Sequence, residues 1–249
     1  MPLDVHALLA ARAAELNAAH AGAAAEDVLA AALGLGRAAL VSSFGADSVV
    51  LLHLVSRVAP ETPVLLLETG MLFPETLAYQ REVADALGLR NVRLIRPASA
   101  DTFLHDPEGD LHGRDPDLCC TLRKVRPLEL ALQGFDAVVT GRKRAQGAAR
   151  AEMPLFEVDG PRLRANPLAA WTGADLAAHM DAHALPRHPL VAQGYPSIGC
   201  APCTTKVAPG EDPRAGRWRG REKTECGIHY AGGVTVRPDG TIATTGGAA

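Results

Sequence analysis

Apolar and polar residues alternate in blocks along most of the chain, and the blocks have two characteristic lengths. Short, almost uninterrupted apolar runs are typical of strands buried on both faces, and they occur at residues 38–43, 63–68 and 136–140. Residues 91–96 predict a further strand. Longer stretches with helical spacing separate them, at about residues 49–58, 74–87 and 118–132. Strands that alternate with helices predict an α/β fold, with a parallel twisted sheet and helices on both of its faces.

The two ends of the chain depart from this alternation. Residues 4–33 are rich in Ala, Leu and Glu and predict two helices before the first strand. Residues 155–164 predict a hairpin, and residues 172–183 predict a capped helix. Beyond residue 230 no core pattern remains, which predicts a mobile tail or small flap. We therefore expect three parts: N-terminal helices (1–36), the α/β domain (37–205) and a mobile C-terminal segment with a flexible tail (206–249).

Composition narrows the class of protein. With 249 residues, 47% of them hydrophobic, the chain can bury a substantial core and is not disordered. It contains no apolar run long enough to span a membrane, and its start does not resemble a secretory signal. We expect a cytoplasmic protein, in which the five cysteines are ligands or catalysts rather than disulfide partners.

Charge is segregated along the chain. Residues 114–150 hold eight basic and four acidic residues, and residues 206–223 hold six basic and three acidic ones. The remainder is strongly acidic, which gives a net charge of -3 and disfavours general nucleic-acid binding. If the fold brings the two basic windows together, they form a pocket for a small anion; otherwise they are two solvated faces.

The loop after the first predicted strand has small residues where an anion could approach backbone N–H groups. It reads Ser42-Ser43-Phe44-Gly45-Ala46-Asp47-Ser48 and precedes a predicted helix. It is neither a Walker A loop nor a dinucleotide-binding glycine loop. Together with Leu67-Glu68-Thr69-Gly70 and Phe73-Pro74-Glu75-Thr76, this loop resembles the adenine-nucleotide alpha hydrolase-like (Rossmann-like) superfamily.

Four cysteines form two pairs that are distant in sequence: Cys119-Cys120 and Cys200-x-x-Cys203. They predict four ligands of one metal centre; buried structural cysteines and a zinc site are the alternatives. Neighbouring residues on a helix point about 100° apart, so adjacent thiolates converge poorly on one ion. They reach separate irons more easily, which favours a [4Fe–4S] cluster.

The fifth cysteine, Cys226, follows a run of basic residues and precedes Gly227. Nearby cations lower the pKa of a thiol and raise its thiolate fraction. Cys226 is therefore a candidate nucleophile, and an incidental surface thiol is the alternative.

The motifs in sequence order make a resemblance specific. Ser-Phe-Gly-Ala-Asp, Cys-Cys-x2-Arg-Lys-x2-Pro-Leu, Gly-Cys-x2-Cys-Thr and Lys-Thr-Glu-Cys-Gly-Ile-His resemble those of the assimilatory adenylyl-sulfate (APS) reductase family. The match covers about residues 38–230. The two cysteine pairs are typical of the iron–sulfur branch rather than of most phosphoadenylyl-sulfate (PAPS) reductases.

The resemblance implies a reaction in sulfate assimilation and cysteine biosynthesis. Cys226 attacks the sulfur of adenylyl sulfate, AMP leaves, and a cysteine S-sulfonate forms. If Cys119, Cys120, Cys200 and Cys203 hold the cluster, no internal thiol remains to release sulfite. An external dithiol, thioredoxin or alternatively glutaredoxin, is then required.

The resemblance also implies a set of substrate-binding residues. They are Ser42, Ser43, Gly45 and Asp47 in the first loop, Leu67 and Thr69 after the second strand, Arg123 and Lys124 in the basic helix, Gly141, Arg144 and Arg150 after the fourth strand, and Arg214, Arg217 and His229 near the end. Gly147 and Arg219-Gly220 depart from the family pattern.

Other functions stay open at this point. A PAPS or dual-specificity reductase is the nearest alternative, followed by an ATP-dependent tRNA-thiolating enzyme and a non-enzymatic zinc module. A homo-oligomer is also compatible with the sequence. His179 and His183 lie four residues apart, which suits a metal, although an exposed or capped helix face explains them as well.

Overall fold

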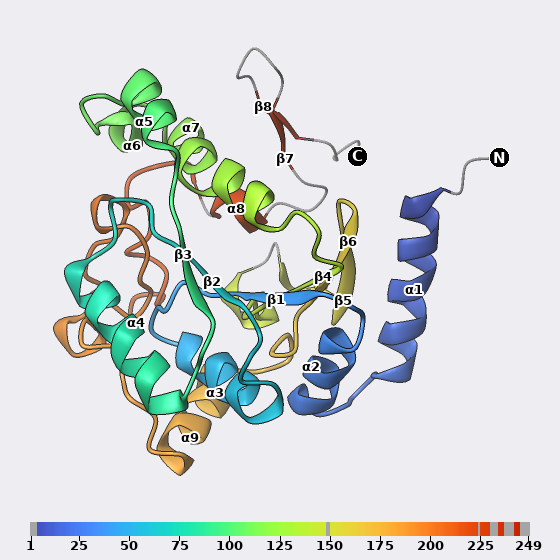
Figure 1. Ribbon diagram of the computed structural model, residues 1–249. Coiled ribbons are helices and arrows are strands. Elements are labelled where there is room, and N and C mark those ends of the chain that lie inside the picture. Colours follow the sequence, from blue (N-terminus) through green and yellow to red (C-terminus); the bar gives the residue numbers. More distant parts are fainter. Residues whose placement is uncertain (1–3, 148–149, 224, 230–233, 237–241, 245–249) are drawn as a thin grey trace.

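A six-stranded sheet forms the centre of the computed structural model, which describes residues 4–147, 150–223, 225–229, 234–236 and 242–244 (Figure 1). The strand order is β3-β2-β1-β4-β6-β5, and all neighbouring strands run parallel except the last pair. The strands are β1 (Ala38–Val41), β2 (Val64–Leu67), β3 (Val92–Ile95), β4 (Ala137–Thr140), β5 (Phe156–Asp159) and β6 (Arg162–Ala165). The four predicted strands and the predicted hairpin are therefore present.

Side chains of the central strands alternate between two apolar clusters. Leu40, Leu66 and Val139 join the larger cluster with the helices of one face. Leu65 and Val138 join a smaller cluster on the other face, where they pack with one helix of the chain's middle third. Because both faces are covered, the strands need continuous apolar sequences, and the predicted α/β class is confirmed.

The larger cluster is covered by helices that are also visible below and beside the sheet in Figure 1. These helices are α1 (Val5–Ala19), α2 (Ala25–Leu33), α3 (Ser48–Val58), α4 (Pro74–Leu87) and α9 (Gly173–Ala182). Asn17 of α1 exchanges two hydrogen bonds with the backbone of Phe156, so α1 is attached to the edge strand β5. The N-terminal helices share the main core, and the three-part division of the chain remains a prediction.

The opposite face carries a helix that changes its geometry midway. The sequence predicts one helix over 118–132, kinked or divided by Pro127. The structure keeps the helix continuous through α7 (Pro116–Cys120), a π-helical turn η1 (Thr121–Val125) and α8 (Arg126–Ala131). Pro127 lacks an N–H, and its ring would clash with a carbonyl four residues earlier, so a wider turn accommodates it. Short helices α5 (Ser99–His105) and α6 (Leu111–Arg114) precede this one.

The elements that the structure describes in the last quarter of the chain are short. They are the 3-10 turns η4 (Val191–Gln193), η5 (Ala201–Cys203) and η6 (Gly227–His229), and an antiparallel pair of strands, β7 (Val234–Val236) and β8 (Ile242–Thr244). The rest of the predicted mobile tail lies outside the described residues. Within the described part of the chain, no helix is long and apolar enough to cross a membrane.

Candidate active site

A cavity of about 380 Å³ lies at the carboxyl ends of the central strands. It is lined by the loops that follow β1 and β4 and by parts of the C-terminal segment. The chain runs from β1 to β2 on one side and returns to β4 on the other. The cavity therefore sits where the winding of the sheet reverses, the usual ligand site of open α/β folds.

The loop after β1 adopts a strained conformation at its centre. Phe44 has a φ of 47° although it is not glycine, and its side chain is completely buried. The backbone N–H of Phe44 donates to Ser42 Oγ at 3.2 Å, and the N–H of Gly45 donates to Ser48 Oγ at 3.0 Å. These bonds hold a short loop directly before α3, where a helix N-terminus favours an anion.

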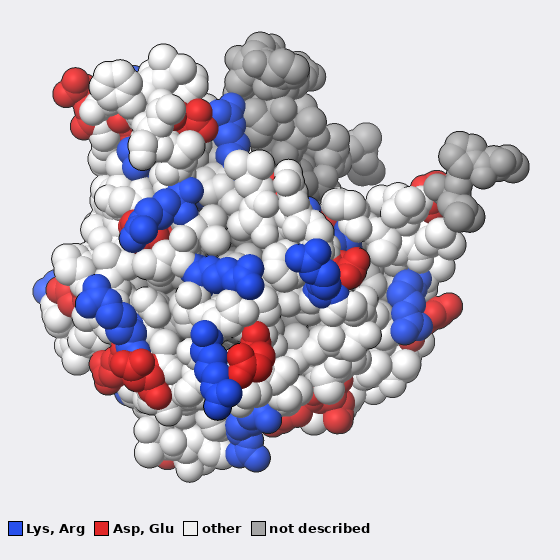
Figure 2. Space-filling view, in the orientation of Figure 1, with Lys and Arg blue, Asp and Glu red and all other residues white. Residues whose placement is uncertain are grey.

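The two basic windows meet at this cavity. Among the residues that the structure describes, six cationic side chains line it against three carboxylates. The cations are Lys124, Arg142, Lys143, Arg150, Arg214 and Arg217, and the acids are Asp47, Asp212 and Glu225. On the face seen in Figure 2, by contrast, basic and acidic side chains are interspersed. Of the two interpretations of the charge pattern, the pocket for a small anion is therefore the one that the structure supports.

Some of these charges are paired at the cavity wall. Lys143 Nζ lies 3.2 Å from Asp47 Oδ2. Arg150 contacts Glu225 at 2.5 Å, and Arg214 lies 3.5 Å from the second oxygen of the same carboxylate. Glu225 precedes Cys226, so this carboxylate links the loop after β4 to the cysteine segment.

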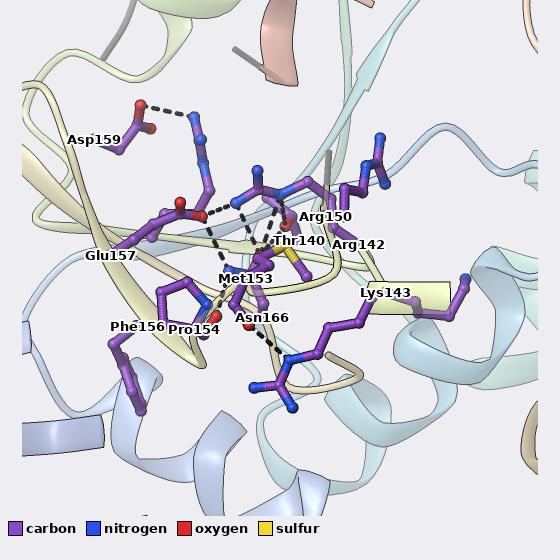
Figure 3. Close-up of polar contacts among 12 residues, drawn as sticks. Thr140, Arg142, Lys143, Arg150, Met153, Pro154, Phe156, Glu157, Asp159 and Asn166 are labelled. Atoms are coloured by element: carbon purple, nitrogen blue, oxygen red, sulfur yellow. Dashed lines mark hydrogen bonds and ion pairs between the residues drawn. The ribbon is translucent and has the colours of Figure 1, made fainter. Parts of the chain in front are cut away.

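Arg142 is a cavity residue that the sequence analysis did not single out. It is held by Glu157 in an ion pair and by Asn166 Oδ1, which accepts from its guanidinium at 3.2 Å (Figure 3). Burial, followed by the nearby Arg164 and Arg150, lowers the pKa of Arg142 to about 9. Its partners come from β5 and the segment after β6, which fix the guanidinium beside the cavity.

Arg144, two residues further along, is not among the residues that line the cavity. Its Nε donates to the carbonyl of Met153 at 2.8 Å, and its backbone N–H donates to Ala169 at 2.9 Å. The loop thus presents Arg142 and Lys143 to the cavity and uses Arg144 to hold itself in place. The run Arg142-Lys143-Arg144 signals basic residues but not which of them face inward.

Arg123 and Thr69 also lie behind the cavity wall rather than on it. The Arg123 guanidinium forms an ion pair with Asp106 at 2.6 Å and donates to the Thr69 carbonyl at 2.9 Å. Thr69 is fully buried, with its Oγ1 at 3.3 Å from Cys200 Sγ. Both residues therefore support the site from behind, joining the end of β2 to the cysteines.

The two adjacent cysteines point to different neighbours, as expected on a helix. Cys119 packs with Leu111 and Leu122, whereas Cys120 packs with Trp218 and Cys226. Burial raises the pKa of the Cys119 thiol to about 11. The nearby Cys200 and Cys203 raise it further, while Arg123 opposes them. Cys200 and Cys203 therefore belong to the electrostatic surroundings of Cys119.

The spacing of these sulfurs bears on the metal that they could hold. In a tetrahedral zinc site with Zn–S bonds of about 2.3 Å, the sulfurs lie about 3.8 Å apart. Among the described residues, no three cysteine sulfurs lie within 4.8 Å of one another. The thiols of Cys119, Cys120, Cys200 and Cys203 therefore do not have the spacing of a single zinc site, and the ligands of a centre with separate metal ions lie further apart.

Cys226 lines the cavity and is 7% exposed. A hydrogen bond from Cys120 lowers its pKa well below the usual value, and Lys124 and Arg217 act in the same direction against the effect of burial. The pKa of Lys124 is raised in turn by three cysteines, Cys226, Cys200 and Cys120. Their effect outweighs the burial of Lys124, which acts in the opposite direction. The arrangement favours a thiolate beside ammonium and guanidinium groups.

Arg217 is positioned by a contact that only glycine permits. A Cβ atom on Gly199 would lie 2.2 Å from the Arg217 guanidinium. The guanidinium stacks over the Trp218 ring at 4.5 Å from its centroid, which makes Trp218 a packing residue of the site. Within the described residues, the buried Nε of Arg217 has no hydrogen-bond partner, so an acceptor in the cavity would satisfy it.

The cavity thus unites most of the predicted residues. Those that line it are Ser42, Ser43, Gly45, Asp47, Leu67, Lys124, Gly141, Arg150, Cys200, Arg214, Arg217 and Cys226. His229 belongs to η6, but its side chain lies outside the described residues. Gly147, where the family pattern differs, has a φ of 145°, a conformation that favours glycine.

Comparisons with known proteins identify the family to which the chain belongs. The sequence model of the phosphoadenosine phosphosulfate reductase domain matches residues 37–206. An adenosine 5'-phosphosulfate reductase from Chelativorans sp. is 51% identical, over 93% of this chain and 94% of its own length. A phosphoadenosine 5'-phosphosulfate reductase from Gloeobacter violaceus is 41% identical, over 76% of this chain and 81% of its own.

A solved structure shows a related fold. The phosphoadenylyl-sulfate reductase from Candida auris, in complex with phosphate, superposes with a TM-score of 0.66 and is 26% identical. The match covers 78% of this chain and 96% of that one.

Proposed function

Because the chain belongs to the phosphoadenosine phosphosulfate reductase family, we propose that it reduces adenylyl sulfate to sulfite and AMP. One observation carries the proposal. The Cys226 thiol opens on a cavity lined, among the described residues, by six cationic side chains, and two of these, Lys124 and Arg217, lower its pKa. A thiolate nucleophile and a binding site for a dense anion therefore coincide, as attack on a sulfate group requires.

The cavity offers separate places for the two ends of the substrate. The apolar residues Leu40, Leu66 and Leu67 line its floor at the strand ends, where an adenosine would be desolvated. The loop after β1 and the N-terminus of α3 face the phosphate. Lys124 and Arg217, which both lower the pKa of Cys226, then lie where the sulfate group meets the thiolate.

The first step forms one S–S bond and breaks one S–O bond. The Cys226 thiolate attacks the sulfate sulfur, and AMP leaves with the bridging oxygen and its electron pair. The nearby cations hold the three sulfonate oxygens, whose charge is delocalised in the transition state. The product is a Cys226 S-sulfonate, which keeps a negative charge within the cationic cavity.

The second step needs two electrons from outside the chain. We infer that Cys119, Cys120, Cys200 and Cys203 hold a [4Fe–4S] cluster, which leaves no internal thiol to resolve Cys226. An external dithiol attacks Cys226 Sγ, sulfite leaves, and the mixed disulfide resolves as the dithiol is oxidised. Thioredoxin or glutaredoxin chemistry fits this role, and we propose the reducing cytoplasm as the enzyme's location.

When bound, the cluster would supply fixed charge beside the cavity, and its irons would hold the four cysteines as thiolates. A ligating Cys120 is itself a thiolate and no longer donates a hydrogen bond to Cys226. Lys124 and Arg217 then carry the stabilisation of the Cys226 thiolate. This division of roles accounts for a buried ammonium group between the nucleophile and the other cysteines.

Mass spectrometry of the intact protein after mixing with adenylyl sulfate tests the proposal. We expect an adduct of one SO3 group on Cys226, which reduced thioredoxin removes. Cys226→Ser should give no adduct, and an adduct on another residue would refute the assigned nucleophile. Comparing kcat/KM for adenylyl sulfate and phosphoadenylyl sulfate identifies the preferred substrate. A preference for the second would refute the proposed specificity while leaving the nucleophile intact.

A further inference from the structure

A cluster of three histidines lies outside the chemistry proposed above. His53 is in the middle of α3, His179 is in the last turns of α9, and His183 is the residue that caps α9. The ring-centroid distances between them are 4.5–5.2 Å. One nitrogen from each ring can be chosen so that all three lie within 4.8 Å of one another.

The distances suit direct coordination of one ion. His53 Nδ1 and His179 Nε2 are 3.0 Å apart. Two ligands of a tetrahedral ion with metal–nitrogen bonds of about 2.0–2.1 Å lie about 3.3 Å apart, so these two nitrogens need only a small adjustment. A hydrogen bond between His53 and His179 would explain the short distance between these two nitrogens, but nothing more. It would leave unexplained why the His183 ring lies against both of them.

The spacing along the chain explains how the cluster forms. His179 and His183 are four residues apart, so they share one face of α9. The α3 helix packs against α9 in the main core, which brings His53 to that face. The sequence analysis noted the α9 pair, but the third histidine lies 126 positions from His179 and is revealed only by the packing of the two helices.

The surroundings favour neutral imidazoles, the form that binds metals. Burial, followed by the charge of His183, lowers the pKa values of both His53 and His179. Arg57 lowers both pKa values as well, and the carboxylate of Glu26 from α2 opposes this effect. His183 is exposed, so water can complete the coordination of an ion held by the three rings.

We propose that His53, His179 and His183 form a binding site for one divalent transition-metal ion of the Zn2+ class, bridging α3 and α9. Three imidazoles with one open position suit Zn2+, whereas Mg2+ and Ca2+ prefer oxygen ligands. The α3 helix follows the loop that lines the cavity, and His179 contacts the cavity residue Trp171 edge-on. The ion would therefore fasten together two helices that support the active site.

Zinc binding by the full-length protein tests this site directly. The protein is purified anaerobically, freed of bound zinc with a chelator, and titrated with Zn2+ by calorimetry. The zinc-loaded protein is then measured by zinc X-ray absorption. We expect one ion per chain with nitrogen and oxygen neighbours at about 2.0–2.1 Å. A sulfur shell at about 2.3 Å would place the zinc on the cysteines and overturn the proposal.

Single variants assign the ligands. His179→Gln and the exposed His183→Gln should each weaken Zn2+ binding by about tenfold or more. Exposed His105, on α5, supplies the matched control, since His105→Gln removes a histidine far from the cluster and should bind as the parent does. At the same concentration, added Zn2+ should raise the melting temperature of the parent and of the control more than that of His183→Gln. Parent-like affinity in both cluster variants, or no stoichiometric uptake by the parent, would overturn the proposal.

Discussion

Replacing Gly199 by alanine should inactivate the enzyme by displacing Arg217 rather than by unfolding the chain. The added Cβ would lie 2.2, 2.5 and 2.8 Å from three atoms of the Arg217 guanidinium, and real Cβ atoms do not approach other atoms so closely. Gly199 has an ordinary φ, so alanine fits the backbone there. The guanidinium is the end of a flexible side chain, and it must leave its place on the Trp218 ring.

The size of the effect follows from what Arg217 does. A preorganised donor that faces developing negative charge contributes about 10²–10³ in rate, or about 2.7–4 kcal/mol. We expect Gly199→Ala and Arg217→Ala each to lower kcat/KM by about that factor. Because both changes remove the same contact, the double variant should be no worse than Arg217→Ala, which is a strongly non-additive cycle.

The assay is the rate of sulfite release with adenylyl sulfate and reduced thioredoxin, run beside chemical denaturation and iron content. Gly113→Ala is the matched control, because a Cβ there meets nothing within 4 Å and Gly113 has an ordinary φ. It should retain parental activity. Full activity in Gly199→Ala would refute the reasoning about Arg217. A large loss of stability or iron in Gly199→Ala would show that the glycine serves the neighbouring Cys200 instead.

Three further predictions concern other parts of the molecule. Cys226→Ser should abolish turnover and keep the iron, whereas Cys119→Ser should lose iron. Turnover by Cys226→Ser, or a full iron content in Cys119→Ser, would contradict the assignment of one cysteine to catalysis and four to the cluster. Glu157→Gln should lower the free energy of unfolding by about 3 kcal/mol in urea titrations, because it leaves the buried Arg142 charge without its ion partner. An unchanged urea midpoint would contradict this and show that the hydrogen bonds to Asn166 are enough to stabilise the Arg142 guanidinium. Burial lowers the pKa of His188 to about 4, below its value of about 6.5 in the unfolded chain, so the stability that it contributes is complete above about pH 6.5 and is lost towards pH 4. Between pH 6.5 and pH 4, the unfolding free energy of His188→Gln should therefore fall by about 3 kcal/mol less than that of the parent. An identical pH dependence in parent and variant would contradict this.

Two bulky residues of the site have backbone conformations that are uncommon for their type. Phe44 and Trp218 have φ values of 47° and 48°, and both side chains are at most 4% exposed. Such conformations cost about 1–3 kcal/mol each and persist only where surrounding contacts enforce them. Here one shapes the loop that faces the proposed phosphate, and the other presents Arg217 and packs on Cys226. The strain is thus located where the site needs fixed geometry.

The sequence by itself determined the sheet and the chemistry of its residues. The strands β1, β2 and β4 were predictable because they are buried on both faces, so their local sequences are continuously apolar. The edge strand β3 is only partly buried and includes the exposed Arg93, and the alternation of strands with helices indicated it. The Cys-Cys and Cys-x-x-Cys pairs, the separate Cys226 and the two basic windows are also local patterns. Their residue types indicate thiolate and anion chemistry whatever the fold around them.

Only the tertiary structure decided which side chains face one another. Arg142 and Lys143 reach the cavity and Arg144 does not, because partners on β5 and after β6 hold this loop. Gly199 matters through Arg217, and His53 meets His179 through the packing of α3 on α9. Such contacts join residues far apart in sequence, and their geometry depends on the whole core. A local pattern therefore indicates the chemistry that is available, and packing selects the groups that act together.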